Sequence, residues 1–498
     1  MRIVHVSYMH PAVAPGGAQQ VAYELFQASL REGHDSYLVA ALEANHQEVY
    51  GKPGAVIVPM PGEDRQFFYF TQFYDYYHLS VQDSRTIQFF RELVERLKPD
   101  VIHFHHYHRI GVESIRAARL AAPNAVIGLT LHEMMAICFA DGQMLKKPSR
   151  ELCYGASPTG CNKCFPDLRP EFFTLRASRL KAILGDCDVF VFPSEFIAER
   201  YTDWGLPPEK CVVIENGQID LGVDFDRKQH SPAVNRFGFF GQFIDNKGVD
   251  VILEALLILA RDKKVPPEGV VVEINGGNKH YATQPYLEKI AQYGEALKKI
   301  SPSQISVRER GSYDREQIQE RMASIDWVMV PSTWWEIFGL VVSEAWMFGR
   351  PVIASDIAAL RDRVQDGVNG FKFPARNAQA LADLMVSLIG DEQQWQSVNS
   401  TIEPIWSDID MLNGYVSIWQ EFKDKRQHGS IQLEAGETAA VEQSVTPMLP
   451  KPRTSKLPQE ASELQQTASD SVKAVAPVEK AQKSAPKKGA AKKTRATV

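Results

Sequence analysis

The feature of this sequence that most constrains its fold is a regular alternation between short apolar segments and amphipathic ones. Residues 2–8, 35–42, 100–106 and 125–132 are short and apolar, and stretches with a helical spacing of apolar residues separate them. Buried strands of a parallel sheet are short and apolar, and the connections between them are usually helices. The alternation therefore predicts βαβ units and a doubly wound parallel sheet.

The same alternation is repeated later in the chain. It restarts at residues 236–243 and continues through 270–277, 305–313, 326–332 and 351–356. A polar, aperiodic stretch near residues 222–234 separates the two sets. We therefore expect two Rossmann-like domains, residues 1–225 and 226–404, with a cleft between them, because ligands in such sheets bind outside the carboxyl ends of the strands. A last helical pattern, at residues 405–427, follows them.

Composition narrows the class of protein. The N-terminus has no charged region followed by an apolar core, and the chain has no run of about 18 apolar residues. We therefore expect neither a signal peptide nor a spanning helix, and we place the protein in the cytoplasm. The net charge of −6 does not favour general nucleic-acid binding.

Residues 428–498 differ in composition from the rest of the chain. They lack aromatic residues and are rich in Pro, Ala, Ser, Gln, Glu and Lys, so we expect a disordered tail that cannot bury a core. Residues 473–498 have eight lysines and arginines against one acidic residue, a net charge of +7. A solvated tail is the first interpretation, and weak binding to an anionic membrane or to nucleic acid is the alternative.

The segment with the most chemistry is residues 331–356. A predicted strand ends in a turn that contains Glu336, Phe338-Gly339-Leu340 follow, and the next helix contains Glu344. Such a turn directs backbone N–H groups and the positive end of a helix dipole outward, which suits a diphosphate. Gly339 allows the backbone to approach that group closely, and Glu344 can accept hydrogen bonds from two sugar hydroxyls.

These residues form the pattern E-x-F-G-L-x-x-x-E-A, which resembles family 4 of the retaining glycosyltransferases. The likeness extends over residues 1 to about 425, because further motifs follow in the family's order. The resemblance implies an α/β fold of the GT-B class, in which two Rossmann-like doubly wound domains face a cleft. It also implies that residues 1–225 bind the acceptor, that residues 226–404 bind a nucleotide-sugar donor, and that the helix at 405–427 packs back on the first domain.

Three residues have the main roles that the resemblance implies. Glu336 is expected to face the donor sugar, Glu344 to hold the ribose hydroxyls, and Lys247 to contact the diphosphate. Gln242 stands where the family often has an arginine, and a glutamine supplies only a neutral hydrogen bond. Lys247 then contributes more of the stabilisation of the leaving group.

Other matched positions complete the expected site. Gly16 and Gly17 resemble the family's glycine loop after the first strand, Gly311 and Tyr313 stand where its base-binding loop would lie, and His132 resembles a histidine that contacts the donor sugar. The expected catalytic residues are Glu336, His132 and Lys247. The expected donor-binding residues are Gly16, Gly17, Gln242, Lys247, Gly311, Tyr313, Phe338, Gly339, Leu340 and Glu344. No catalytic metal is expected, since a lysine and helix N-termini can offset the charge of a diphosphate.

A cysteine cluster follows His132. Cys138, Cys153, Cys161 and Cys164 lie in one short window, and the last two have the C-x-x-C spacing of a zinc knuckle. Four thiolates can hold a structural zinc ion, which suits a cytosolic chain better than disulfides do. Free or redox-active thiols and disulfides are the alternatives. A subset of the family has a similar four-cysteine insertion, and we expect it to shape the acceptor side of the cleft.

Two further clusters lie in the predicted first domain. His103, His105, His106 and His108 follow one another closely, and we interpret them as structural or as lining the acceptor cleft. A metal site is the alternative, which the absence of a helical H-x-x-x-H spacing disfavours. The aromatic residues of 67–77 are either core or a surface for sugars or a membrane.

We therefore predict a retaining glycosyltransferase that moves a hexose-type sugar from a nucleotide-sugar donor to a saccharide or lipid-linked saccharide, in cell-surface polysaccharide or lipopolysaccharide synthesis. Peripheral contact with the inner face of the membrane belongs to this prediction, and specific nucleic-acid binding does not. Two alternatives are an epimerase or phosphorolytic enzyme of the same fold and a non-catalytic sugar-binding or scaffold protein. The Glu336–Glu344 spacing together with Lys247 disfavours the epimerase, and the presence of Glu336 and Lys247 disfavours the non-catalytic protein.

Overall fold

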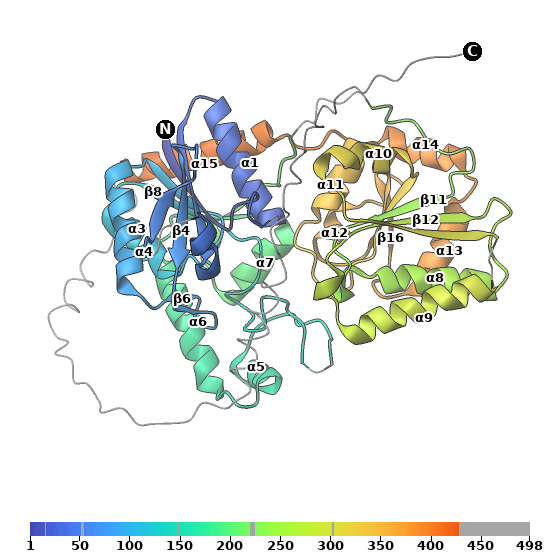
Figure 1. Ribbon diagram of the computed structural model, residues 1–498, viewed down its shortest axis with the longest axis horizontal. Coiled ribbons are helices and arrows are strands. Elements are labelled where there is room, and N and C mark those ends of the chain that lie inside the picture. Colours follow the sequence, from blue (N-terminus) through green and yellow to red (C-terminus); the bar gives the residue numbers. More distant parts are fainter. Residues whose placement is uncertain (15, 51–53, 148, 220–224, 301–302, 428–498) are drawn as a thin grey trace, which may run out of the picture. The chain divides into compact units, whose positions relative to one another are not determined.

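The computed structural model describes residues 1–14, 16–50, 54–147, 149–219, 225–300 and 303–427, which belong to one compact unit, Met1–Leu433. Two largely parallel sheets, each with helices on its faces, make up the described chain (Figure 1). The predicted pair of doubly wound sheets is therefore confirmed. The predicted tail, residues 428–498, lies outside the described residues.

The first sheet has the strand order β10-β9-β8-β7-β1-β2-β4-β3, and its neighbours are parallel except β3 with β4. Its strands are β1 (Arg2–Tyr8), β2 (Asp35–Glu43), β3 (Ile57–Pro59), β4 (Gln66–Thr71), β7 (Val101–Phe104), β8 (Val126–Thr130), β9 (Val189–Phe192) and β10 (Cys211–Val213). Its helices are α1 (Gly17–Arg31), α2 (Gln47–Tyr50), α3 (Ser84–Leu97), α4 (Glu113–Ala121), α5 (Pro158–Cys164), α6 (Pro170–Leu184) and α7 (Glu195–Trp204). A separate hairpin consists of β5 (Tyr74–Asp75) and β6 (Ser80–Val81). The chain order of the strands reverses between β1 and β7, where sheets of this kind bind ligands.

The second sheet is entirely parallel, with the order β13-β12-β11-β14-β15-β16. Its strands are β11 (Arg236–Phe240), β12 (Val270–Asn275), β13 (Ile305–Gly311), β14 (Trp327–Val330), β15 (Val352–Ser355) and β16 (Gly370–Phe373). Its helices are α8 (Val249–Arg261), α9 (Gln284–Ile300), α10 (Ile318–Ala323), α11 (Leu340–Met347), α12 (Ala358–Arg363), α13 (Ala378–Leu388) and α14 (Glu392–Ser400). Here the strand order reverses between β11 and β14, so this second switch point is the place to look for a ligand site.

The central strands are apolar on both faces because helices cover both faces. Every residue of β7, β8, β14 and β15 is buried. A parallel sheet of this kind needs helical crossovers, and those helices shield both of its sides from water. This is the physical reason why the short apolar runs in the sequence become strands at these positions.

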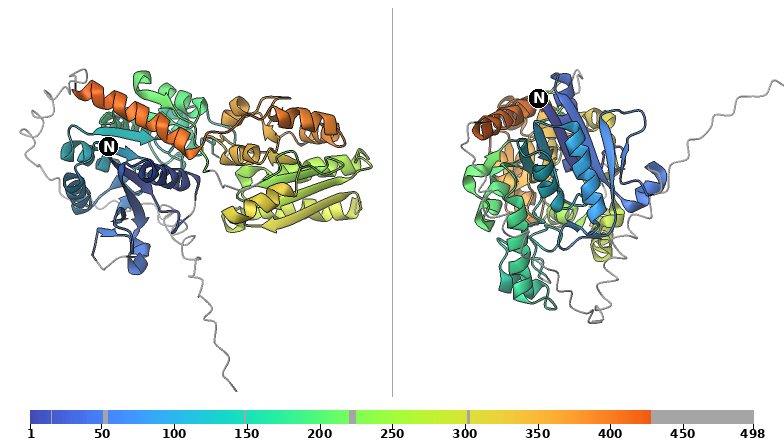
Figure 2. Two further views of the ribbon diagram at one scale, coloured as in Figure 1. Left: turned by 90° about the horizontal axis from the view of Figure 1, so that it is seen from above. Right: turned by 90° about the vertical axis from the view of Figure 1, so that its left-hand side faces the viewer.

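The last described helix, α15 (Asp408–Gln427), packs against α1 and β8 of the first sheet (Figure 2). Its Tyr415 and Trp419 are almost completely buried. The Tyr415 hydroxyl lies 2.8 Å from the Thr130 hydroxyl, and the Trp419 indole N–H donates to His103 Nδ1 at 3.1 Å. The end of the described chain therefore completes the core of its beginning.

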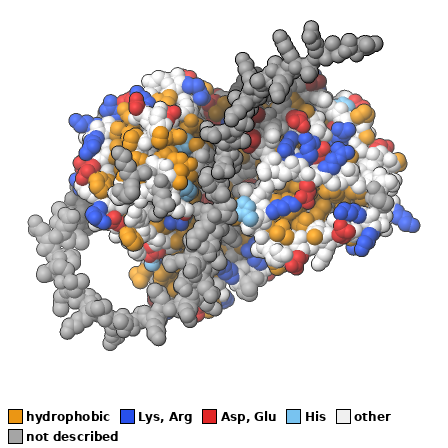
Figure 3. All heavy atoms as spheres, viewed as in Figure 1, with side chains coloured by type: hydrophobic (Ala, Val, Ile, Leu, Met, Phe, Trp, Pro, Cys, Tyr) orange, Lys and Arg blue, Asp and Glu red, His pale blue; other side chains and the backbone are white. Residues whose placement is uncertain are grey.

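The surface of the described chain combines apolar and charged side chains. On the face drawn in Figure 3, patches of hydrophobic side chains lie on both halves, with Lys, Arg, Asp and Glu interspersed among them. Among the helices that the structure describes, none is long and apolar enough to cross a membrane.

Candidate active site

Lys247 and Glu336 form a charged pair at the carboxyl edge of the second sheet. Lys247 ends a short turn after β11, and Glu336 lies in the turn between β14 and α11. The Lys247 ammonium lies 3.0 and 2.8 Å from the two carboxylate oxygens of Glu336, and the Ser332 hydroxyl donates to one of them at 2.7 Å. The structure thus brings together the two residues that the resemblance places around the reacting centre.

A close backbone approach holds this pair in place. Gly248, directly after Lys247, has φ of 75°, and a Cβ at this position would lie 2.0 Å from the carbonyl oxygen of Pro331. The Thr333 N–H also donates to the carbonyl of Asn246 at 2.9 Å. Only glycine allows both the backbone angle and the contact, so Gly248 is what lets the β11 and β14 loops touch.

The Glu336 carboxyl has a lowered pKa. Burial alone would raise this pKa, but the charge and hydrogen bonds of Lys247 and the hydrogen bond of Ser332 outweigh burial. Glu336 is therefore ionised at neutral pH, in a site where only 12% of its side chain is exposed. A carboxylate held in this way can stabilise positive charge that develops on a nearby carbon.

The turn after Glu336 is fixed by a buried arginine that the sequence analysis missed. Gly339 has φ of 79° and precedes α11. Arg363 of α12 donates to the carbonyls of Phe338 and Gly339, both at 3.1 Å, and to the Ser343 hydroxyl at 2.7 Å. Its guanidinium carbon lies 3.7 Å from the centre of the Phe338 ring. Arg363 therefore holds the predicted diphosphate turn from behind.

A cavity of about 210 Å³ lies beside the start of α11. Leu340, Glu344 and Tyr313, all predicted to bind the donor, line this cavity. The Oε2 atom of Glu344 is buried and has no hydrogen-bond partner among the described residues. Burial raises the pKa of Glu344 to about 7; the charge of Glu24 acts in the same direction and that of Arg315 opposes it. The cavity thus contains an unused acceptor of the kind that sugar hydroxyls need.

An ion pair from two distant parts of the chain borders the same cavity. Arg315, after β13, lies 2.7 Å from Glu24 of α1, and the Glu24 side chain is only 3% exposed. Nearby, α1 begins at Gly17, where a Cβ would lie 3.1 Å from the Leu340 side chain. The predicted glycine loop, Gly16-Gly17, therefore reaches the start of α11. The Arg315–Glu24 pair was not predicted.

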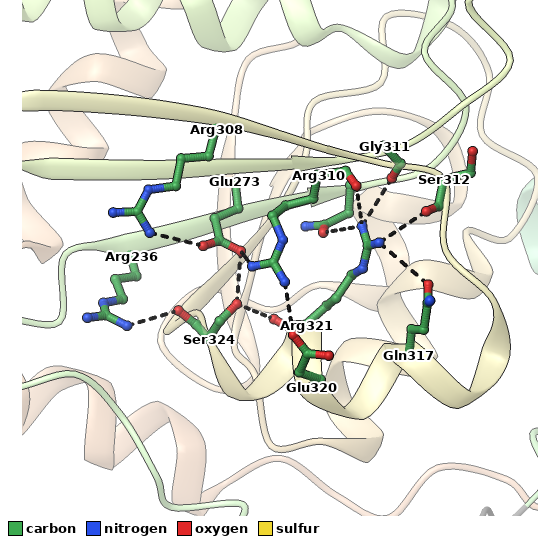
Figure 4. A network of polar contacts seen from close by, with 11 residues as sticks. Arg236, Glu273, Arg308, Arg310, Gly311, Ser312, Gln317, Glu320, Arg321 and Ser324 are labelled. Atoms are coloured by element: carbon green, nitrogen blue, oxygen red, sulfur yellow. Dashed lines mark hydrogen bonds and ion pairs between the residues drawn. The ribbon is translucent and has the colours of Figure 1, made fainter. Parts of the chain in front are cut away.

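The loop after β13 is fixed by a network of arginines (Figure 4). Arg321 of α10 donates to the consecutive carbonyls of residues 310–312 at distances between 3.0 and 3.2 Å. The carboxylate of Glu273, also in this network, accepts from Arg310 at 3.0 Å. Gly311, with φ of 70°, allows the chain to turn toward Tyr313. The predicted base-binding loop is thus rigidly supported.

Two predicted residues lie apart from these contacts. Gln242 is exposed after β11. His132 follows β8 in the first half, and its Nε2 is buried without a hydrogen-bond partner among the described residues. Burial lowers the pKa of His132 to about 4, so its ring is neutral at pH 7. The roles predicted for Gln242 and His132 stay predictions.

Other histidines, on β1, on β7 and just after β7, form hydrogen bonds inside the core. His5 Nδ1 lies 3.2 Å from His105 Nε2, and His103 Nε2 lies 2.7 Å from the Thr130 hydroxyl. Burial lowers the pKa of each of these histidines, so all are neutral. Burial also raises the pKa of Glu133, next to His132, to about 7. The edge of the first sheet therefore holds hydrogen-bonding groups that are mostly uncharged.

The four clustered cysteines do not form a closed metal site. All four are free and partly exposed. Among the residues that the structure describes, no three His, Cys, Asp or Glu side chains come together in a way that could hold a metal ion. The structural zinc ion stays a prediction. Metal analysis of protein purified without chelator tests it, and a stoichiometry near zero with four titratable thiols would contradict it.

Comparison with known proteins identifies the class and the family. HepE of Anabaena, whose crystal structure contains UDP and glucose, is 16% identical and aligns over 84% of this chain and 100% of that chain with a TM-score of 0.57. This likeness shows the fold, and the fold is GT-B. Residues 15–221 match the family described as Glycosyltransferase Family 4, and residues 234–391 match the Glycosyl transferases group 1. The chain belongs to the family 4 glycosyltransferases.

Curated relatives match only parts of the chain. D-inositol 3-phosphate glycosyltransferase of Jonesia denitrificans is 28% identical over 217 residues, which are 41% of this chain and 48% of that protein. Phosphatidyl-myo-inositol mannosyltransferase of Mycobacterium leprae is 37% identical over 86 residues, which are 17% of this chain and 23% of that protein. The chain thus spans about half the length, or less, of these relatives.

Proposed function

We propose that this chain is a retaining glycosyltransferase. It takes a sugar from a nucleoside-diphosphate donor and transfers it to a saccharide or lipid-linked saccharide, in cell-surface polysaccharide synthesis at the cytoplasmic face of the membrane. The observation that carries the proposal is the Lys247–Glu336 pair, in which Glu336 lies on the same β14–α11 segment as the unpaired carboxylate oxygen of Glu344. The M. leprae relative is named for phosphatidyl-myo-inositol, which supports including lipid-linked acceptors.

The cavity beside α11 takes the nucleoside. Glu344 offers its free oxygen to the ribose hydroxyls, and a carboxylate can accept two such bonds side by side. Tyr313, on the loop that Arg321 supports, lines the same cavity where the base enters. A preformed cavity with few placed polar groups is the usual form of a small-molecule site.

The diphosphate lies between Lys247 and the start of α11. The ammonium of Lys247 can donate three hydrogen bonds. Two of them go to the Glu336 carboxylate, which leaves one N–H for a phosphate oxygen. The backbone N–H groups that follow Gly339 point out of the N-terminus of α11 and favour negative charge. No protein-bound metal is required to neutralise the diphosphate.

The reaction separates charge across the pair. As the bond between the sugar and the diphosphate breaks, positive charge develops on the anomeric carbon and is stabilised by ionised Glu336. Negative charge develops on the leaving phosphate and is stabilised by Lys247. The acceptor hydroxyl attacks from the face that the phosphate leaves, and its proton passes to a phosphate oxygen. The configuration at the anomeric carbon is retained, and no separate protein base is needed.

A donor screen tests the proposal. Purified protein is heated with each member of a panel of nucleotide sugars, and release of nucleoside diphosphate is then measured with the donor that raises Tm most. We expect one donor to stabilise the protein and to be hydrolysed slowly. Glu336→Gln should abolish hydrolysis and leave the fold intact, because the amide keeps the shape of the carboxyl but loses its charge.

The same screen separates the proposal from a non-catalytic sugar-binding protein. A donor that stabilises wild type and Glu336→Gln equally, with no hydrolysis by either, would favour that alternative. Full hydrolysis by a folded Glu336→Gln protein would remove Glu336 from the mechanism. NMR of the glycoside formed with an acceptor gives the anomeric configuration of the transferred sugar. A configuration opposite to that of the sugar in the donor would contradict retention.

A further inference from the structure

A second cavity borders the catalytic turn. Its volume is about 470 Å³, and it shares no lining residue with the cavity that contains Glu344. Its walls come from three places: Tyr154 in the cysteine-bearing segment, Phe196 to Arg200 on α7, and Asp356 to Asp362 at the start of α12. Trp335, directly before Glu336, lies at the point where these walls meet. The mechanism proposed above makes no use of this cavity.

Three aromatic rings form one side of the cavity. The ring of Trp335 lies 5.0 Å from that of Tyr154 and 5.2 Å from that of Phe196. The Trp335 indole N–H donates to the carbonyl of Cys153 at 3.0 Å, which fixes the ring against the cysteine-bearing segment. Tyr154 is 66% exposed, an unusual position for a large aromatic residue. Aromatic faces of this kind offer flat apolar area with a polar tip.

The other residues that line the cavity are largely polar and have charges of both signs. Arg200 is held by the Tyr154 carbonyl at 3.0 Å and by Asp203 at 3.1 Å. In the wall formed by α12, Arg361 donates to Asp356 at 3.0 Å, and Asp362 is exposed. The remaining charged lining residue is Glu199, so acids outnumber arginines. This balance disfavours a phosphate and suits a neutral ligand that both donates and accepts hydrogen bonds.

The cavity is connected to the reacting centre by short links. Trp335 and Glu336 are neighbours in the chain, so the aromatic wall and the catalytic carboxylate share one turn. The N–H of Ala359, in the α12 wall, donates to the Glu336 carbonyl at 3.1 Å. A ligand that fills the cavity would therefore contact Trp335, the residue directly before Glu336.

We propose that this cavity binds the acceptor saccharide, with one sugar ring against Tyr154 and Trp335 and its hydroxyls between α7 and α12. Aromatic rings beside carboxylates and guanidinium groups fit the alternating apolar and hydroxyl surfaces of a saccharide. The inference rests on the proposed glycosyltransferase function and assigns the cysteine-bearing segment a part in recognising the acceptor.

Two variants from different walls test this site, with a third as control. Tyr154→Ala removes the exposed ring, and Asp362→Asn removes a charge from the α12 wall; both positions are exposed, so the variants should fold. Tyr281→Ala removes a comparably exposed tyrosine, 54% exposed, that does not line the cavity. Each full-length protein is applied to a printed array of neutral and acidic oligosaccharides, with and without UDP, and its Tm is measured with UDP.

We expect wild type to retain one or a few related oligosaccharides, and both cavity variants to bind them at least tenfold more weakly. The control should bind within twofold of wild type, and the Tm shift with UDP should be unchanged in all. Wild type that retains no oligosaccharide, or cavity variants that bind as well as wild type, would overturn the proposal. Binding that depends on Tyr154 in a protein that binds no nucleotide would support the saccharide site and refute the transfer reaction.

Discussion

The carboxyl edges of the two sheets differ in the charge of their side chains, although the strand order reverses in both sheets, between β1 and β7 and between β11 and β14. At the first edge, burial lowers the pKa of His105, His106 and His132, so their rings are uncharged at neutral pH. At the second edge, Lys247 and Glu336 are both charged and lie within 3.0 Å of each other. The first edge is lined mostly by neutral rings, with the Arg109–Glu43 ion pair beside them, whereas the second edge is built on the Lys247–Glu336 ion pair.

This difference shows what each edge can bind. A neutral hydrogen-bonding group costs much less to bury than a charge, so the first edge can be enclosed by the core and still present polar atoms. A buried charge needs a partner, and Lys247 and Glu336 supply one to each other. The charged edge suits an anionic diphosphate, and the neutral edge suits uncharged hydroxyls. Three predictions test this division, and a fourth tests backbone strain in α12; they run from the largest expected effect to the smallest.

The largest effect is expected from removing Trp419, which closes the neutral edge from behind. Trp419→Ala should lower the free energy of unfolding by about 3–5 kcal/mol, since it leaves a cavity and removes the donor to His103 Nδ1. Urea denaturation measures this change. Trp406→Ala, at a position 42% exposed, is the control and should cost much less. A loss below about 1 kcal/mol for Trp419→Ala would show that the neutral edge does not depend on α15.

The next effect concerns the charged edge. Lys247→Ala should slow donor hydrolysis by about 10²–10³-fold, because the leaving phosphate loses its cation. It should also raise the pKa of Glu336, since burial would then be less opposed. Steady-state kinetics and the pH dependence of kcat measure both changes. Lys247→Arg keeps the charge and should lose less activity. Equal rates for wild type and Lys247→Ala would show that the charged edge is not catalytic.

Glu344 has a charge state between those of the two edges. Its pKa is raised to about 7, so it is about half ionised at neutral pH. In the unfolded chain its pKa is near 4.5, so its contribution to stability is complete below that pH and is lost as pH rises through about 7. Glu344→Gln should therefore raise Tm more at pH 8 than at pH 5. It should also weaken UDP binding by about tenfold at pH 8, where the wild-type carboxylate is ionised. A Tm difference that does not change with pH would contradict the raised pKa.

The smallest effect is expected at Ala358, the first residue of α12. Its φ of 51° lies in the left-handed region, which costs a residue with a Cβ about 1 kcal/mol. Ala358→Gly should therefore leave stability unchanged or raise it by up to about 1 kcal/mol. Ala359→Gly, one residue later in the same helix, should lower it by about 0.5–1 kcal/mol. Equal losses for both variants in thermal unfolding would contradict strain at Ala358.

The fold could be predicted because its signal is local. Short apolar runs between helical patterns mark strands that are buried on both faces, whatever their partners are. Lys247 and Glu336 were named individually by resemblance to a family pattern. Their direct contact could not be predicted, because they are 89 residues apart and meet only where β11 pairs with β14.

The residues that were missed depend on contacts of long range. Arg363 has the sequence context of an ordinary helix arginine, yet it supports the turn that contains Gly339. Arg315 and Glu24 are 291 residues apart, and neither belongs to a recognisable pattern. The cysteine spacing drew attention to thiols, whereas the structure uses the backbone of the same segment, where the Cys153 carbonyl accepts from Trp335. No periodicity or motif encodes contacts of this type.

Helix α15 has a consequence for the order in which the protein is completed. Ile3, Val21 and Leu25 share one apolar cluster with Met411, Tyr415 and Trp419. The strands of the first sheet are synthesised before those of the second, and domains generally fold as they emerge from the ribosome. The half that is synthesised first is therefore the half that is finished last. Until α15 emerges, the apolar residues of the first half that it covers lack their packing partner, while the second half already has all of its strands.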